Sequence, residues 1–321
     1  MSTEAIAAEK PKRNYNALFG LTLLALLVLL WVILSVSTQS FASANNISNL
    51  LRQGSMIAIL AVGQTFVIIT GGIDLSVGAV VGFATVITAM LINAGVPVFA
   101  AILITLLVGV AIGLFHGFGI VRMGLPPFII TLATLTSLRG IGLLMTNGNS
   151  ISINNDAFQE FSRNSFVGIP NLFWMVILVG IPAYIFLHHS RWGRYLFSVG
   201  SNAEASRLSG VNVQRTIYMA YTLSGLCAAF VGVLLASRIG IGNPTQAEGW
   251  ELQAIASSVI GGISLFGGRG SILGTLFGAM IVGVVSMGLN MMGADPQWKV
   301  LLTGVLIIVI VYFDGLRRRG K

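Results

Sequence analysis

Residues 188–215 read HHSRWGRYLFSVGSNAEASRLSGVNVQR. The expected orientation of the whole chain in a membrane follows from this stretch. On both sides of it the chain is almost entirely apolar over lengths that can cross a bilayer several times. The stretch itself carries one acid, Glu204, and four arginines: Arg191, Arg194, Arg207 and Arg215. Because loops rich in arginine and lysine stay on the cytoplasmic side of a membrane, we expect this segment to be a cytoplasmic loop.

The same loop contains the signals of a short helix. Ser201 and Glu204 have the spacing of a capping box, and Gly210 can adopt the left-handed conformation that ends a helix. The helix between them is about eight residues, roughly 12 Å long, and marginal alone in water. We expect it to form by docking, on its own membrane domain or on a cytoplasmic partner. The alternative is a solvated loop with one helical turn.

Composition makes lipid the solvent for most of this chain. Of the 321 residues, 55% are hydrophobic and 9% are charged, whereas soluble domains carry about 25% charged residues. The net charge of +8 does not indicate nucleic-acid binding, because the basic residues lie between apolar spans and at the two tails. Cys227 is the single cysteine, which excludes an intrachain disulfide and a cysteine-based metal cluster.

Hydropathy predicts an all-α polytopic membrane protein of about ten transmembrane helices, some broken at glycines. The domain plan is a cytoplasmic tail (1–16), one transmembrane domain (17–314) with a cytoplasmic loop at 189–215, and a basic cytoplasmic tail (315–321). We expect the first apolar run to be retained as a span, because it is longer than the apolar region of a cleaved signal peptide. The expected spans are about 17–36, 51–70, 75–93, 97–120, 127–146, 171–188, 216–237, 252–266, 270–291 and 297–314.

Charge supports an even number of crossings with both termini in the cytoplasm. Both tails are basic, and six crossings before His188 place the arginine-rich loop inside. The loop 147–170 then falls outside. Arg52 and Arg238 fall at outer ends of spans and count against this topology.

Two glycine-rich breaks interrupt the apolar runs and share the pattern Gly-Gly-Ile-x-Leu. Broken helices often line a pathway in transporters, and the alternative is that these glycines permit tight turns or close packing. Asp74 lies in the first break, and we expect it either to have a functional role there or to cap the span that follows. Among other polar groups within spans, His116 is expected to be packed and hydrogen-bonded, and Arg139 to pair with a helix C-terminus or snorkel. The candidate pathway residues are Gly71, Gly72, Asp74, Ser76, Gly261, Gly262, Ser264 and Asn290.

The sequence contains no phosphate-binding loop of the Gly-x4-Gly-Lys-Ser/Thr type, no catalytic Ser/His/Asp set and no metal pair. We therefore expect no catalytic residues, no bound metal and no cofactor in this chain. The chain has many predicted spans and one structured loop, but no site of its own that could bind an energy source such as ATP. This combination favours a partner that supplies energy.

Several motifs, in order, are similar to one family. The chain resembles the ribose/xylose-type sugar permeases of ATP-binding cassette importers, over roughly residues 45–315. The matching motifs are Gly193-Arg194-Tyr195 with 200–210, Ile69–Gly78, Pro127–Leu132, Glu251–Ala256 with Gly261–Gly270, and Gly288-Leu289-Asn290.

The resemblance implies a non-enzymatic permease of the bacterial inner membrane that forms a dimer with a second copy. It also implies a cytoplasmic ATPase, which holds the ATP and Mg, and a periplasmic sugar-binding protein. The cargo would be a monosaccharide, a ribose-like pentose first of all. The coupling helix that seats in the ATPase would be Asn202, Ala203, Glu204, Ala205, Ser206, Arg207, Leu208, Ser209 and Gly210.

Two other functions remain open from the residues. A secondary sugar transporter driven by an ion gradient would need paired intramembrane acids or an unwound sodium site, and Asp74 alone is a poor start. A membrane scaffold that transports nothing is disfavoured by the glycine breaks and the docking loop.

Overall fold

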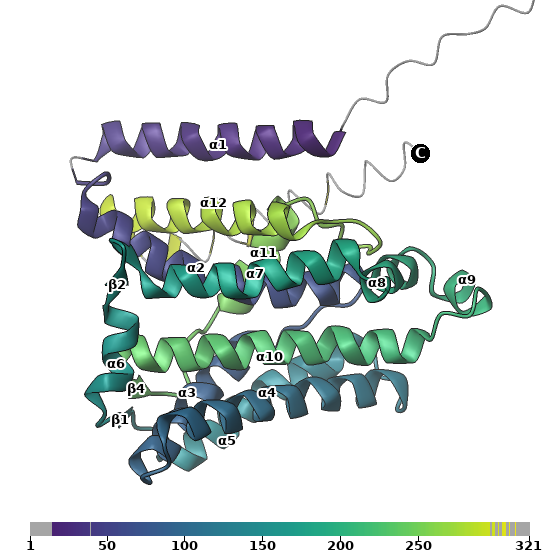
Figure 1. Ribbon diagram of the computed structural model, residues 1–321, viewed down its shortest axis with the longest axis horizontal. Coiled ribbons are helices and arrows are strands. Elements are labelled where there is room, and N and C mark those ends of the chain that lie inside the picture. Colours follow the sequence, from purple (N-terminus) through teal and green to yellow (C-terminus); the bar gives the residue numbers. More distant parts are fainter. Residues whose placement is uncertain are drawn as a thin grey trace, which may run out of the picture.

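The computed structural model describes residues 15–38 and 40–295, together with 297, 298, 301, 304, 305, 308 and 312. The fold is a bundle of long helices that run side by side (Figure 1). The helices are α1 (Tyr15–Ser37), α2 (Ala44–Ile69), α3 (Val77–Asn93), α4 (Val98–Val121), α5 (Pro127–Thr146), α6 (Asp156–Arg163), α7 (Asn171–His189), α8 (Arg191–Ser201), α9 (Ala203–Leu208), α10 (Val213–Ile239), α11 (Trp250–Ile260) and α12 (Ile272–Met291).

Four two-residue strands join the helices at one end of the bundle. They are β1 (Ile151–Ser152), β2 (Ser165–Phe166), β3 (Ile169–Pro170) and β4 (Ile241–Gly242). β1 pairs antiparallel with β4, and β2 with β3. We call this end, which also holds α6, the strand end, and the opposite end, where α8 and α9 lie, the α9 end (Figure 1). The loops 147–170 and 189–215 therefore lie at opposite ends, as the predicted topology requires.

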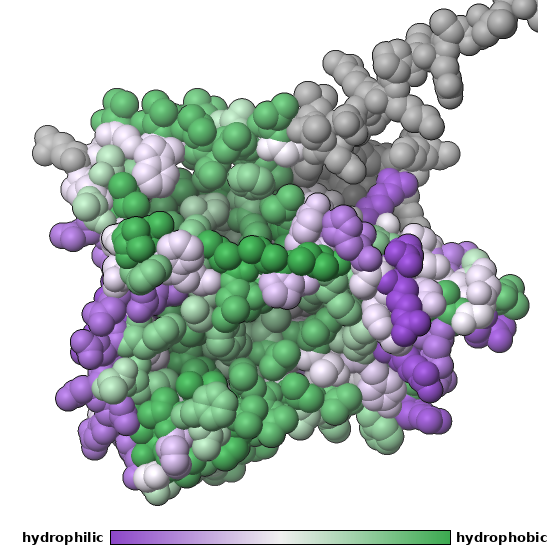
Figure 2. Space-filling model, in the orientation of Figure 1, coloured by the Kyte–Doolittle hydropathy of each residue, from purple (hydrophilic) through white to green (hydrophobic). Residues whose placement is uncertain are grey.

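The expectation of a multi-span helical protein is confirmed. Within the described residues, seven helices are long and apolar enough to cross a membrane, and α3 is a shorter apolar helix of 17 residues. Apolar side chains cover the middle of the visible face, whereas hydrophilic ones gather at the two ends (Figure 2). The predicted tail 315–321, residues 1–14 of the predicted N-terminal tail and most of the predicted span 297–314 lie outside the described residues.

Helix α10 lies at the centre of the bundle and packs against α2, α3 and α4. It approaches α4 closely because glycines face it there. A Cβ on Gly109 would lie 2.4 Å from the Gly225 carbonyl oxygen, and one on Gly113 would lie 2.3 Å from that of Tyr221. Within lipid no hydrophobic force drives helices together. Small residues at this spacing let membrane helices approach closely and associate through van der Waals contact.

The predicted span 252–266 is wrong in form. The structure has a helix of 11 residues, α11, preceded by the non-helical segment 243–249. A helix of this length spans only about 16 Å, roughly half the hydrocarbon core. After β4 at the strand end, the segment passes along α3 toward its first turn, and α11 continues from there.

Glycines of α3 form the slot that holds this non-helical segment. A Cβ on Gly82 would lie 2.5 Å from the Pro244 carbonyl oxygen, and one on Gly78 would lie 2.7 Å from that of Ala247. Arg139 of α5 pairs with Glu248 of the segment at 3.0 Å, so the pairing with a helix C-terminus expected for this arginine is wrong. Non-helical backbone is tolerated at membrane depth only where protein or a water-filled cavity surrounds it. Short apolar runs in sequence do not reveal this arrangement.

Candidate functional site

The loop at the α9 end folds as two consecutive helices, α8 and α9. Ser190 caps α8 by accepting a hydrogen bond from the backbone N–H of Gly193 at 3.1 Å. Asn202 caps α9 in the same way, through the backbone N–H of Ala205 at 2.9 Å. The predicted capping box is therefore wrong: Ser201 is the last residue of α8, and the asparagine that follows takes the cap.

The predicted coupling residues, Asn202–Gly210, form a small projecting turn. Ser206 alone among these nine is buried, and its hydroxyl meets that of Ser198 in α8 at 2.6 Å. Gly210 ends the turn with φ +82°, as predicted. Leu208 is 75% exposed. The turn is thus fastened to α8 on one side and presents an uncovered apolar side chain on the other.

Charge on this turn is paired. Arg207 donates two hydrogen bonds to the carboxylate of Glu204, at 2.6 and 3.0 Å. This hydrogen bonding lowers the pKa of the Glu204 carboxyl below its ordinary value. Because both side chains are largely exposed, the pair orients the turn more than it stabilises the fold.

Beneath the turn, backbone contacts join α8 to both glycine breaks. The backbone N–H of Gly268 donates a hydrogen bond of 2.9 Å to the carbonyl oxygen of Ile69, at the end of α2. A Cβ on Gly200 of α8 would lie 1.7 Å from that same oxygen and 2.7 Å from the Gly268 nitrogen. Residues 69–71, 200 and 267–268, which we call the glycine junction, therefore meet with no side chain between their backbones.

Asp74 is buried inside the bundle, 1% exposed. One carboxylate oxygen accepts hydrogen bonds from the backbone N–H and hydroxyl of Ser76, at 3.0 and 2.6 Å, and the other accepts from Ser224 of α10 at 2.8 Å. Its backbone carbonyl accepts from the side chain of Gln64 at 3.2 Å. Such bonds satisfy a carboxylate that lipid could not solvate.

His116 and Tyr221 lie next to this carboxylate. Their ring centroids are 5.9 Å apart with edge-to-face geometry. A Cβ on Gly72 would lie 2.3 Å from the Tyr221 hydroxyl oxygen, so any larger residue there would displace the Tyr221 side chain. The prediction that His116 is packed is confirmed, because the residue is buried. The prediction that it is hydrogen-bonded is wrong, because neither ring nitrogen has a partner within the described part of the chain.

The predicted pathway residues separate into three groups. Gly71, Gly72, Asp74 and Ser76 lie together at the first break. Gly261, Gly262 and Ser264 lie at the second break, whose loop reaches the first through the glycine junction. Asn290 is exposed in the last turn of α12, toward the other end of the bundle.

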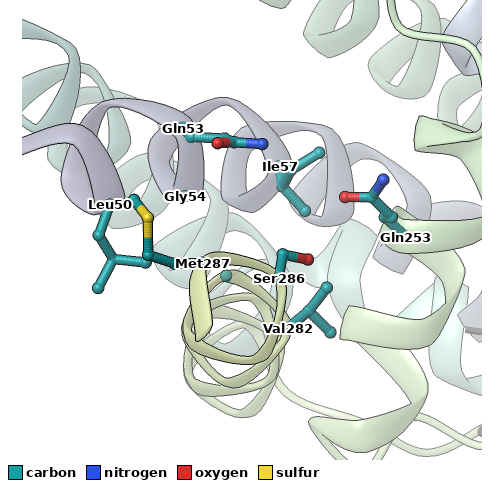
Figure 3. A pocket seen from close by; sticks show the side chains of 9 residues that line it. Leu50, Gln53, Gly54, Ile57, Gln253, Val282, Ser286 and Met287 are labelled. Carbon is teal, nitrogen blue, oxygen red and sulfur yellow. The ribbon is translucent and has the colours of Figure 1, made fainter. Parts of the chain in front are cut away.

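Sequence analysis missed a groove between α2, α11 and α12. Three polar side chains line it: Gln53, Gln253 and Ser286, with Gly54 and Gly283 between them. Figure 3 shows the two glutamine side chains extending toward one another, with the Ser286 hydroxyl directed into the same space. The signal in sequence was Gln53 and Gln253, one near the start of each of two predicted spans, which hydropathy averages away.

The described residues hold no group of three or more His, Cys, Asp or Glu side chains that could bind a metal ion. The structure is that of a helical membrane protein with a projecting turn at one end. Beneath the turn lies a helix break that hydrogen bonds hold in place, and a polar groove lies on one flank.

The chain has full-length relatives among known proteins. Residues 46–311 match the family model described as branched-chain amino acid transport system / permease component. The ribose import permease protein RbsC of Escherichia coli K12 is 38% identical over 99% of this chain and 100% of its own length. The fructose import permease protein FrcC of Rhizobium meliloti is 42% identical over 87% and 80%.

The D-allose transport system permease protein AlsC of Escherichia coli K12 is 34% identical over 97% of this chain and 96% of its own length. No solved structure matches the chain significantly. The resemblance seen in the motifs is therefore confirmed along almost the whole sequence. The chain belongs to the family of branched-chain amino acid transport system permease components, and is a non-catalytic membrane transport subunit.

Proposed function

We propose that this chain is the membrane subunit of an ATP-binding cassette importer that carries a monosaccharide across a bacterial inner membrane. Its partners are a second copy of the chain, a cytoplasmic ATPase that binds ATP and Mg, and a periplasmic sugar-binding protein. The named relatives import ribose, fructose or allose. A ribose-like pentose is the first candidate cargo, because the ribose permeases match over the full chain length.

The projecting turn is the observation that carries this proposal. It is held by Ser206, Asn202 and Gly210, and it stands clear of the bundle at the α9 end (Figure 1). At its tip Leu208 is an apolar side chain that is 75% exposed, because the other described residues do not cover it. A groove of the ATPase would cover this side chain, and burying it would contribute roughly 1.5–3 kcal/mol per copy.

The glycine junction gives the turn a mechanical route into the bundle. Movement of α9 displaces α8, because the two are joined at Ser198 and Ser206. Gly200 of α8 touches the backbone of Ile69 and Gly268 directly, so the displacement reaches both helix breaks without a compressible side chain between. Closely packed elements of this kind move as rigid bodies. ATP-driven closure of the partner would thereby shift α2 against the loop 261–270.

The proposed topology has ten crossings with both termini in the cytoplasm. Seven long helices, α3, and the non-helical segment with α11 account for nine of them. The tenth is the predicted span 297–314. In this arrangement the α9 end faces the cytoplasm, and the strand end faces the periplasm and the sugar-binding protein.

Reconstitution tests this function. Liposomes containing the permease and its ATPase, with the sugar-binding protein outside and ATP inside, should accumulate radiolabelled D-ribose, D-fructose or D-allose. Accumulation should require ATP and persist when ionophores dissipate ion gradients. Uptake without ATP that ionophores abolish would instead identify a secondary transporter.

A further inference from the structure

The groove between α2, α11 and α12 lies near the middle of the bundle. It includes Ile57, which is midway along the 26 residues of α2 and therefore about 20 Å from either end. Gln253 lines the groove from the first turn of the half-helix α11, and Gln53 lies one turn from Ile57 on α2. Ser286 of α12, 8% exposed, completes the polar set.

None of these three side chains forms a hydrogen bond within the part of the chain that the structure describes. A carboxamide without a partner costs several kcal/mol in hydrocarbon. Nine-tenths of the Ser286 surface is covered by protein, yet its hydroxyl remains unpaired at the edge of the groove. Three such groups from three different helices line one groove, where water or a polar ligand would supply the partners that they lack.

We infer that this groove is the part of the translocation path that contacts the sugar at membrane depth, which rests on the proposed import function. Each glutamine carboxamide offers two N–H donors and an oxygen acceptor, and the serine offers one of each. This set matches the neighbouring hydroxyls of a neutral monosaccharide and includes no charge that would retain it. A few neutral hydrogen bonds bind weakly, which allows rapid release.

Gly54 and Gly283 lie where α2 and α12 approach one another along the groove. A Cβ on Gly283 would lie 3.4 Å from the Leu50 side chain and 3.8 Å from the Gly54 Cα, and a Cβ on Gly54 would lie 3.9 Å from the Met280 sulfur. Asn290 is one helical turn beyond Ser286 on α12, toward its last residue. Exposed Asn290 therefore continues the polar face from the groove toward the strand end, where the sugar-binding protein would deliver its cargo.

Thiol labelling tests whether the groove is open to water. Cys227 is buried and is first replaced in a Cys227→Ala background. Gln253→Cys in the assembled complex should react with a hydrophilic methanethiosulfonate at least about tenfold faster than Leu107→Cys. Leu107 is the matched control, since it is 57% exposed near the middle of the apolar helix α4 and lies outside the groove.

Uptake tests the contact with sugar. Gln53→Leu and Gln253→Leu preserve side-chain size and remove the hydrogen-bonding groups. Each should lower ATP-dependent uptake of D-ribose, D-fructose or D-allose, whichever the wild type carries, by about tenfold, the equivalent of one hydrogen bond. ATPase stimulation by the binding protein should persist, because the groove is remote from α9. Thr136→Val, an exposed polar position of α5 outside the groove, should leave uptake unchanged.

The two proposals fail in different ways. A wild-type complex that takes up none of the three sugars would contradict the proposed function. Normal uptake by both leucine variants, or a Gln253→Cys thiol as inert as that of Leu107→Cys, would overturn the groove assignment while leaving the importer in place.

Discussion

Ser224 of α10 donates a hydrogen bond of 2.8 Å to the carboxylate of Asp74, which lies 150 residues earlier in the chain. This bond ties the first helix break to the central helix of the bundle. Asp74 therefore fastens the break from inside, and its side chain does not open onto the groove formed by α2, α11 and α12.

Asp74→Leu should reduce both stability and transport. The substitution leaves the buried hydroxyls of Ser76 and Ser224 without their acceptor, at about 1–3 kcal/mol each. Thermal unfolding of the detergent-purified protein and sugar uptake would measure the loss. Asp74→Asn keeps an acceptor of the same shape and should lose less. An Asp74→Leu protein with normal unfolding temperature and normal uptake would show that the carboxylate is dispensable.

Leu208→Asp should abolish coupling while the protein still inserts and folds. The charge would enter an apolar contact with the ATPase, at a cost on the order of a few kcal/mol, whereas the exposed position tolerates it in the free chain. Stimulated ATPase activity and uptake of the complex are the readouts. Leu208→Met, which keeps the apolar contact, should retain both. Full activity of the aspartate variant would mean that α9 is not the coupling element.

Gly200→Ala should disrupt the glycine junction. Its methyl group would lie 1.7 Å from the Ile69 carbonyl oxygen, so α8 must move away from α2. We expect a lower unfolding temperature and lost transport in membranes that contain the inserted chain. Gly140→Ala in α5 is the control, because its Cβ meets nothing within 4 Å. Equal behaviour of the two variants would contradict a role for the junction.

Topology is tested by reporter fusions at residues 160 and 200, in α6 and α8. They should report opposite sides of the membrane, residue 160 outside and residue 200 inside, because the two helices lie at opposite ends of the bundle (Figure 1). Both fusions on one side would refute the ten-crossing arrangement.

The amino-acid sequence by itself determined that this is a polytopic helical membrane protein with one basic loop and a glycine stop at Gly210. These properties are local: a bilayer imposes span length and hydropathy, basic residues gather in the loops outside it, and a left-handed turn favours glycine. The motifs were also sufficient to identify the family, because they occur in the same order along the chain.

Only the tertiary structure decided which polar groups meet. The bond between Asp74 and Ser224, the contact of Gly200 with Ile69, and the convergence of Gln53 and Gln253 all join residues far apart in sequence. The non-helical segment at 243–249 likewise depends on glycines of α3 that make room for it. The physical reason is that lipid satisfies no polar group, so each partner must come from whichever helix packing brings near.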